Sequence, residues 1–485
     1  MFVGIDIGTS GVRGILVDAA GAVLAAANAP LTTQHPHPGW SEQDPHSWVS
    51  ATESVMGDLK SMTPNAFRDI RAVGLSGHMH GATLLDSDGN PLAPCILWND
   101  TRAEQEAKTL DAIPLMRDVS ANIVFPGFTA PKLAWVAKHR PSIFEKVTKV
   151  LLPKDFVRLW LTGEYLSEMS DSAGTSWLDV GARSWSDAAL EATGMRRDQM
   201  PSLVEGNAHG GVLRRPLKER WGLHNNVIVA GGAADNAAAA CGAGCLGEGS
   251  AFVSLGTSGV LVAARNGFSP APDAAVHTFC HAVPDRWYQM GVTLAATDSL
   301  NWLARSLKQS AASLAEALPE KVAGPGTALF LPYLSGERTP HNDAAVRGAF
   351  FGLDIATGPT ELTQSVMEGV SFALRDSFEA LSATRAELDN VLAVGGGARS
   401  RFWLETLATL FDRPLVRPAA GELGAASGAA RLAICAATGA SPDEVMATPD
   451  TAEVIEPRRA FTDAYNESYE RYRAAYPALR QVMGI

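Results

Sequence analysis

The chain has 485 residues and a mass of 51.2 kDa, which is too long for one ordinary hydrophobic core and predicts two or three domains. Its 46% apolar and 19% charged residues are typical of a globular protein and exclude disorder, coiled coil and collagen. The formal net charge of −12 would repel a phosphate backbone, so we expect no nucleic-acid partner. Any site that holds phosphate must do so locally, through backbone N–H groups, a metal ion or a few placed cations.

The N-terminus is predicted to be a strand that carries an acid. Residues 1–6 read Met-Phe-Val-Gly-Ile-Asp, without the basic and apolar regions of a signal peptide. No apolar stretch is long enough to span a bilayer, because Arg431 interrupts the alanine-rich run near 424–440. The five cysteines are odd in number and sparse, which favours buried, reduced thiols over a disulfide framework or a zinc site. We therefore expect a soluble cytoplasmic protein without a membrane partner.

Two short motifs recur in the same order in the two halves of the chain. Residues 5–12 (Ile-Asp-Ile-Gly-Thr-Ser-Gly-Val) and 253–260 (Val-Ser-Leu-Gly-Thr-Ser-Gly-Val) each lie between strand-like runs and predict a β-hairpin. Residues 226–232 resemble 390–397, since each is a buried-strand run followed by a glycine turn that opens a helix. The order predicts a duplicated α/β domain. The alternative is the chance recurrence of glycine-rich turns.

The first half is predicted to carry an insertion. The spacing between its two motifs is about 84 residues longer than in the second half, and the extra residues are best placed within 95–200. We expect the insertion to supply the surface that selects the substrate, and the cleft between the two similar halves to hold the ligands. The insertion holds five tryptophans: Trp98, Trp135, Trp160, Trp177 and Trp185.

The two Gly-Thr-Ser-Gly turns are candidate phosphate-binding loops. Successive N–H groups and hydroxyls wrap anionic oxygens, and one turn in each half can hold a polyphosphate from both sides. Beside the first turn, Asp6 offers a hard oxygen ligand for Mg²⁺ and Arg13 a local positive charge. A plain hairpin connection is the alternative, which the pairing of two such turns disfavours. The predicted phosphate-binding residues are Thr9, Ser10, Arg13, Gly256, Thr257 and Ser258, with Asp6 as the metal ligand.

A third glycine-rich segment, Gly395-Gly396-Gly397-Ala398-Arg399-Ser400, is a candidate nucleoside-binding loop. It follows a predicted strand and opens a helix, but Ser400 stands where a dinucleotide fingerprint has its last glycine. The sequence contains no Gly-Lys dipeptide, which excludes a P-loop. We expect Gly396, Gly397 and Ala398 to face a nucleoside.

Asp235 is the candidate general base. It follows Gly231-Gly232-Ala233-Ala234 at the end of a buried strand and precedes Asn236 and an alanine-rich helix. Local sequence alone favours an N-cap role for this residue. However, its position corresponds to that of the nucleotide loop in the other half, which would place the carboxylate in the ligand cleft. Phosphoryl transfer needs a carboxylate there, to orient a hydroxyl and to accept its proton late in a loose transition state.

These residues together resemble the FGGY family of carbohydrate kinases, and the resemblance runs from Met1 to the tail. It implies a duplicated actin-like, ribonuclease-H-type ATPase fold of two lobes, with Mg²⁺ and ATP in the cleft and lobes that close on the substrate. The motifs that resemble the family are 6–10 and 255–259 (phosphate loops), 131–135 and Gly348–Glu368 (signatures), and Gly395–Ala398 (adenosine loop).

Residues 79–83 (Met-His-Gly-Ala-Thr) resemble the family segment that binds a pentulose, and residues 98–102 and 334–341 resemble the same subgroup. The resemblance implies ATP-dependent phosphorylation of D-xylulose at its 5-hydroxyl. It also implies that Asp235 is the base and that the sugar contacts are Met79, His80, Asp235 and Asn236. The alternatives are a family kinase acting on ribulose, glycerol or gluconate, an actin-like or chaperone-like ATPase, and, more weakly, a dinucleotide-dependent oxidoreductase.

The expected lobes are residues 1–245, with the sugar-binding insertion, and 246–485, with the nucleotide site. Two positions depart from the subgroup. His78 replaces a glutamine, which could alter sugar hydrogen bonding or add a pH response, and Ala234 replaces a glycine, which reduces φ freedom. A lone histidine such as His80 is more often a structural residue than a ligand. The expected partners are the sugar and ATP, and analogy with the family implies a homodimer.

Overall fold

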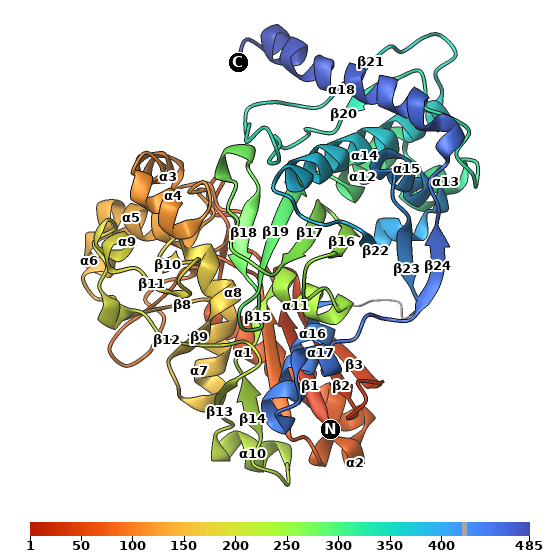
Figure 1. Cartoon of the computed structure of the whole chain (residues 1–485). Helices are drawn as coiled ribbons and strands as arrows, with labels where there is room; N and C mark the ends of the chain where they lie inside the picture. Colours follow the sequence, from red (N-terminus) through yellow and green to blue (C-terminus); the bar gives the residue numbers. More distant parts are fainter. Residues whose placement is uncertain (420–423) are drawn as a thin grey trace.

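Each half of the chain is built around a seven-stranded mixed sheet (Figure 1). The structure is a computed structural model that describes residues 1–419 and 424–485. The first sheet has the order β13-β14-β5-β1-β2-β3, with β15 paired to β5. The second has the order β18-β19-β17-β16-β22-β23-β24. The first-sheet strands are β1 Phe2–Ile7, β2 Gly11–Val17, β3 Val23–Pro30, β5 Ala72–Gly77, β13 His209–Val212, β14 Ile228–Ala230 and β15 Ala233–Ala234.

The strands of the second sheet repeat those of the first. They are β16 Ser250–Leu255, β17 Gly259–Arg265, β18 His277–Cys280, β19 Trp287–Thr293, β22 Asn390–Val394, β23 Leu415–Pro418 and β24 Thr451–Ile455. The pairs β1–β2 and β16–β17 are antiparallel hairpins, as predicted, and each first strand has a parallel neighbour, β5 or β22. The predicted duplication is therefore confirmed.

One predicted correspondence within the duplication is wrong. The segment 390–397 contains β22, which pairs with β16 as β5 pairs with β1, so its counterpart is 72–80 and not 226–232. The counterpart of β14 is β23, because each lies one strand further out in its sheet. β14 and β22 are both short apolar strands, so their local patterns are alike although their places in the two sheets differ. The start of α16 (Ala425–Thr438), and not the 395–397 loop, therefore corresponds to Asp235.

Two helices, α11 (Asp235–Ala243) and α16 (Ala425–Thr438), lie between the two sheets (Figure 1). α16 packs on β1 and β5, where a Cβ at Gly4 or Gly74 would lie 1.9 or 1.8 Å from a backbone oxygen of the helix. α11 and α16 also meet through their backbones, since a Cβ at Gly428 would lie 1.8 Å from the Ala238 oxygen. The C-terminal half thus contributes a helix to the first lobe's sheet.

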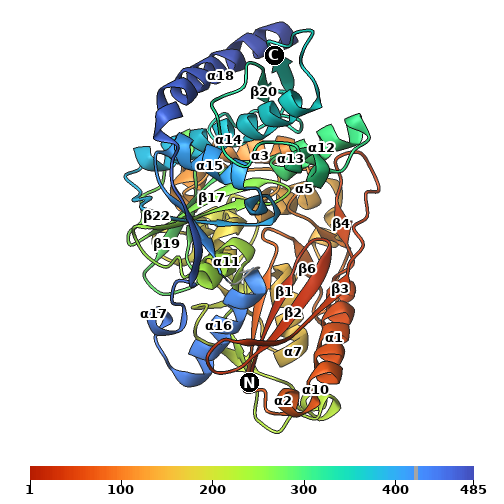
Figure 2. The same ribbon diagram turned by 90° about the vertical axis from the view of Figure 1, so that its right-hand side faces the viewer.

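Further helices lie on the outer side of each lobe (Figure 2). In the first lobe these are α1 (Pro45–Met62), α2 (Pro64–Arg68), α7 (Pro153–Thr162) and α10 (Arg215–Trp221). In the second lobe they are α12 (Thr297–Leu307), α13 (Ala311–Glu316), α14 (Pro359–Ala383), α15 (Arg401–Phe411) and α18 (Thr462–Met483), and α18 packs outside α14 and α15. No helix among the described residues has the length and apolar character to cross a membrane. The five cysteines are free and buried, as predicted.

The insertion forms a separate, largely helical layer at the left of Figure 1. Its elements are α3 Glu104–Asp111, α4 Pro114–Ser120, α5 Thr129–His139, α6 Pro141–Phe144, β8 Lys149–Leu151, β9 Leu166–Glu168, α8 Met169–Ser172, β10 Leu178–Asp179, β11 Ser184–Trp185 and α9 Asp187–Glu191. Trp135, Trp177 and Trp185 lie in its hydrophobic core. The β18–β19 hairpin of the second lobe contacts this layer, because Asn122 exchanges two hydrogen bonds with the Thr278 backbone, at 2.9 and 3.0 Å.

Candidate active site

The first Gly-Thr-Ser-Gly turn joins β1 to β2 and is held by side chains from outside the repeat. Gly8 N–H donates to the Gly11 carbonyl at 3.0 Å, which closes the turn. The Thr9 hydroxyl accepts from Trp98 Nε1 at 2.9 Å, and the Thr9 carbonyl accepts from Gln43 Nε2 at 2.6 Å. Ser10 is exposed. Gln43 had no predicted role, because a local pattern carries no signal for a contact 34 residues away.

Two carboxylates lie close together beside this turn. Asp6, on β1, is opposite Arg13 on β2 and level with Ser76 on β5, and Asp235 follows Ala234, which is level with Gly77 on β5. Burial raises the pKa of Asp6 in spite of the nearby Ser76 hydroxyl and Arg13 charge. Burial, followed by the negative charge of Asp6, raises the pKa of Asp235 to about 7.

The environment of Asp6 fits a Mg²⁺ ligand. Its Oδ1 is buried and has no hydrogen-bond partner among the described residues, which is costly for a carboxylate unless a ligand meets it. The described residues contain no cluster of three or more potential ligands. Mg²⁺ characteristically takes one or two protein carboxylates and fills its other positions with water and phosphate oxygens, so such a cluster is not required.

Asp235 is the first residue of α11 rather than its N-cap. The N-cap position is Ala234, and it has no side-chain capping bond. The Asp235 carboxylate instead accepts from the backbone N–H and the Nδ2 of Asn236, at 2.7 and 2.9 Å. The carboxylate is partly exposed, and its pKa near neutrality leaves a substantial ionised fraction at pH 7. These properties suit a general base, and the place of Asp235 inside α11 excludes it as the N-cap of this helix.

Met79 and His80 follow β5 at the same end of the sheet. His80 has φ +71°, and its carbonyl accepts from the Lys132 ammonium at 3.0 Å and the Thr129 hydroxyl at 3.1 Å. Its Nδ1 lies 2.7 Å from the Gly174 carbonyl oxygen. A carbonyl can only accept, so Nδ1 carries the proton. Because burial lowers the ring's pKa to about 3, the ring is neutral and Nε2 is an acceptor for a hydroxyl.

Side chains from both lobes surround the His80 ring. It stacks on Phe128 of the insertion with ring centroids 4.4 Å apart, and Phe279 of β18 lies 6.3 Å away. The Arg338 guanidinium of the second lobe lies 3.8 Å from the centroid of Phe125. The insertion and the second lobe thus meet at His80, which sequence spacing could not show.

The two departures from the subgroup pattern cause no strain. Ala234 has φ −58° and ψ 154°, which any residue adopts, and its N–H donates to the Ser170 hydroxyl at 3.0 Å. His78 is buried, and burial lowers its pKa to about 3, so its ring is neutral at physiological pH. The predicted pH response of His78 is therefore not supported.

The second turn and the glycine-rich loop are neighbours in the second lobe. β16 and β22 pair up to Ser254 and Val394, so Gly256–Ser258 and Gly395–Gly397 leave the same end of the sheet. The Gly256 carbonyl accepts from the Thr297 backbone N–H and hydroxyl, at 2.9 and 2.7 Å, which fixes the turn against α12. Gly395 has φ +90°, and a Cβ there would lie 2.8 Å from the Leu255 oxygen, so glycine is required.

A cavity of about 810 Å³ opens beside this loop, between α12, α13 and α15. Gly396 and Gly397 line it, as the nucleoside prediction requires, whereas Ala398 is buried behind the loop and does not. Its volume is suited to a nucleoside-sized ligand. The residues of the opposite wall were not predicted, and they include Leu300, Asn301, Ala312 and Ala315.

The fold and the site are those of a two-lobed phosphotransferase, with a large cavity beside the glycine-rich loop of one lobe and the Asp235 carboxylate near the Met79–His80 turn in the other. Residues 1–242 match the N-terminal domain, and residues 251–437 the C-terminal domain, of the FGGY family of carbohydrate kinases. The chain therefore belongs to this family and is an ATP-dependent carbohydrate kinase. Membership confirms the resemblance and the duplicated actin-like fold, and decides against a filament or chaperone ATPase.

Curated relatives and solved structures resemble the chain over nearly its whole length. It is 45% identical to a xylulose kinase of Escherichia coli K12 over 480 residues, 98% of this chain and 96% of the relative. A solved xyloylose (xylulose) kinase from Brucella ovis is 53% identical with a TM-score of 0.97, over 99% of both chains. A gluconate kinase from Lactobacillus acidophilus, 24% identical over 98% of this chain and 97% of the other, still has a TM-score of 0.91. The fold alone therefore does not select the sugar.

Proposed function

We propose that this enzyme transfers the γ-phosphoryl group of ATP to the 5-hydroxyl of D-xylulose. The observation that carries the proposal is the pairing of Asp235 with the Met79–His80 turn at one end of the first sheet, in a chain similar to xylulose kinases over almost its full length. The expected division into lobes 1–245 and 246–485, with the insertion in the first, is part of this proposal. The free, buried thiols suit a reducing cytoplasm.

The chain's own groups supply positioning and proton transfer. His80 Nε2 accepts a hydrogen bond from a sugar hydroxyl, and Asn236 and Met79 flank the acceptor. Asp235 orients the attacking hydroxyl and takes its proton late, as a loose phosphoryl-transfer transition state requires. The turns at Thr9–Ser10 and Gly256–Ser258 present N–H groups and hydroxyls to the phosphates, with Arg13 adding positive charge. Mg²⁺ held at Asp6 would neutralise charge on the phosphate oxygens.

A substrate panel tests the proposal. The purified enzyme, with Mg²⁺ and ATP, is given D-xylulose, ribulose, glycerol and gluconate in turn, and ADP release is followed in a coupled assay. We expect the highest kcat/KM with D-xylulose. A higher value with any other member would overturn the sugar assignment and leave the family unchanged. Sedimentation of the same preparation tests the expected homodimer.

Replacing Ala312 by tryptophan is expected to raise the KM for ATP by about ten-fold or more, because the indole would occupy the cavity beside Gly396. The KM for the sugar should stay within two-fold. The control is Ser313→Trp, which adds the same side chain at the next exposed residue of α13, outside the cavity lining. Equal KM values for ATP in the two variants would remove the nucleotide from this cavity.

Replacing Asp6 by asparagine is expected to raise the Mg²⁺ concentration needed for half-maximal turnover by about ten-fold, because a neutral amide is a weaker ligand than a carboxylate. The measurement is a Mg²⁺ titration of initial rates at saturating sugar and ATP. The control is Asp18→Asn, which removes a charge at the end of β2 away from the turn. An unchanged titration in the Asp6 variant would contradict its metal role.

A further inference from the structure

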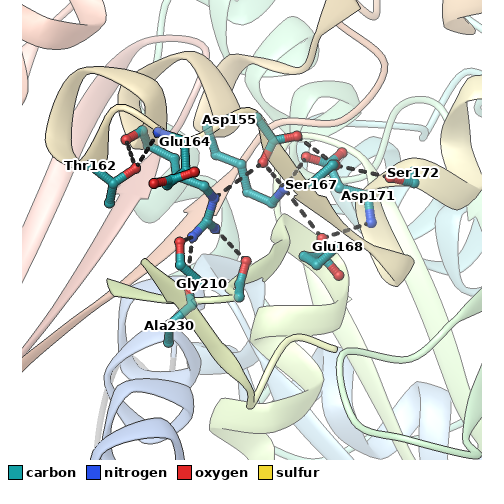
Figure 3. Close-up of polar contacts among 12 residues, drawn as sticks. Asp155, Thr162, Glu164, Ser167, Glu168, Asp171, Ser172, Gly210 and Ala230 are labelled. Atoms are coloured by element: carbon teal, nitrogen blue, oxygen red, sulfur yellow. Dashed lines mark hydrogen bonds and ion pairs between the residues drawn. The ribbon is translucent and has the colours of Figure 1, made fainter. Parts of the chain in front are cut away.

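A cluster of buried charged side chains, part of which is labelled in Figure 3, adjoins the segment that leads to Asp235, and the proposed phosphoryl-transfer chemistry does not use it. The cluster comes from α7, which packs on the first sheet, and from β9 and α8 at the inner edge of the insertion. All of its charged side chains are fully buried, where an ion is stable only if it is paired. Its members are Lys154, Asp155, Arg158, Glu168 and Asp171.

The segment from Gly231 to Ala234 consists of two glycines and two alanines, so no side chain of its own can form a hydrogen bond that fixes its position. Gly232 has φ +79°, and a Cβ there would lie 2.4 Å from the Leu75 oxygen, so the backbone is placed in a tight space. The position of Asp235 must therefore be set by groups outside the segment.

Arg158 fixes the beginning of the segment. Its Nη1 donates to the Ala230 carbonyl at 2.6 Å, and its Nη2 donates to the Gly231 carbonyl (Figure 3). The planar guanidinium thus holds two consecutive carbonyls where β14 ends.

Ser170 fixes the end of the segment, one residue before Asp235. Its hydroxyl accepts from the Ala234 N–H at 3.0 Å and donates to Glu168 Oε2 at 2.7 Å. Glu168 also accepts from the backbone N–H groups of Ser170 and Asp171, at 2.6 and 2.9 Å. The carboxylate therefore sets both the position and the direction of the Ser170 hydroxyl, and a charged partner strengthens the bond that the hydroxyl accepts.

Lys154 joins the two anchors. Its ammonium lies 2.7 Å from Asp155 Oδ1, 3.3 Å from Glu168 Oε1 and 3.0 Å from Asp171 Oδ2. Burial raises the pKa of Asp171 well above its ordinary value. Both cations of the cluster lie within ion-pair distance of its carboxyl groups. Such a paired network is rigid, because displacing one member leaves an uncompensated buried charge.

We propose that Ser170, held by Glu168, is a positioning residue for the base. It fixes the Ala234 amide and thereby the direction in which the Asp235 carboxylate leaves the end of β15. The inference deepens the proposed function and rests on the assignment of Asp235 as the base. The inner edge of the insertion thus supports catalysis by positioning the base. Its cluster is not among the proposed sugar contacts, and the insertion is not part of the duplicated domain.

The test compares Ser170→Ala with Ser172→Ala. Both serines are fully buried in α8 and both hydroxyls belong to the same network, but Ser172 donates to Ser167 and has no bond to the segment before Asp235. We expect kcat to fall about ten-fold or more in Ser170→Ala, with the KM for ATP within two-fold, because the nucleotide cavity is untouched while the base is misplaced. In Ser172→Ala, kcat should stay within two-fold.

Further variants separate positioning from folding. Ser170→Cys nearly keeps the side-chain volume but accepts a hydrogen bond only weakly, so its kcat should fall as in the alanine variant. Ser170→Thr keeps the hydroxyl, so its kcat should be close to that of the wild type. All rates are measured below the onset of thermal unfolding, with the sugar that the wild type turns over fastest. Equal kcat in the two alanine variants, or wild-type kcat in Ser170→Cys, overturns the proposal.

Asp235→Asn, assayed alongside, distinguishes the two levels of inference. Full turnover by Asp235→Asn would overturn the base assignment and with it the positioning role. Loss of turnover in Asp235→Asn together with full turnover in Ser170→Ala would overturn the positioning role alone.

Discussion

Asp235→Ala is expected to lower kcat by about 10³-fold while leaving ATP binding intact, because the variant loses the group that orients the acceptor hydroxyl and takes its proton. The carboxylate is suited to proton transfer near neutral pH, since burial and the neighbouring Asp6 raise its pKa to about 7, and its bonds to Asn236 hold it at the start of α11. Steady-state rates at saturating substrates measure kcat, and calorimetric titration with ATP measures binding.

The matched control is Asp44→Ala. Asp44 does cap a helix, since its side chain accepts from the His46 N–H at the start of α1. Its removal should cost about 1 kcal/mol of stability and leave kcat unchanged. If Asp235→Ala instead lowered the melting temperature as Asp44→Ala does and kept its turnover, Asp235 would be a structural residue of α11.

The candidate residues for phosphate binding and proton transfer could be proposed from the sequence because each stands in a short segment with its own pattern. All of these groups lie at or near strand ends, where backbone groups are free to bind a ligand. They are the turns at 8–11 and 256–258, the carboxylates of Asp6 and Asp235, and the glycine loop at 395–397. The duplication was predictable for the same reason, since each hairpin repeats a local sequence.

The supports of these residues could not be predicted. These supporting residues form hydrogen bonds with residues that lie 34 to 94 positions away in the sequence, and a periodic sequence pattern does not indicate such bonds. They are Gln43, Trp98, Gly174 and Ser170. The wrong correspondence of 226–232 with 390–397 has a related cause. Each lobe has two neighbouring parallel strands, β5 and β14 or β22 and β23, and only the pairing of strands separates them.

The helices between the lobes connect stability with catalysis. α11 begins with Asp235, and it packs on α16, which in turn lies on β1 and β5. β1 carries Asp6 one residue before its end, and β5 ends one residue before His78. Glycine allows the closest contacts in this stack: at Gly4 and Gly74 between sheet and helix, and at Gly428 between the helices. A change in the spacing of α11 and α16 must therefore move the base relative to the metal ligand.

Gly428→Ala is accordingly expected to lower both stability and turnover. The added Cβ would lie 1.8 Å from the Ala238 carbonyl oxygen and 3.0 Å from the Gly242 N–H, and neither backbone group can move without its helix. Overpacking of this kind costs about 3 kcal/mol, which should lower the melting temperature by roughly 5 °C or more. Because α11 is displaced, kcat should fall even well below that temperature.

Gly57→Ala is the matched control, since it adds the same methyl group to the middle of helix α1, where a Cβ would meet nothing within 4 Å. Alanine is a better helix former than glycine by about 1 kcal/mol, so this variant should melt at or above the wild-type temperature with unchanged kcat. Thermal unfolding gives the melting temperature of both variants, and steady-state rates give their kcat. If Gly428→Ala melts and turns over like Gly57→Ala, the crossing of α11 and α16 tolerates a wider spacing, and the position of Asp235 is set from the insertion side alone.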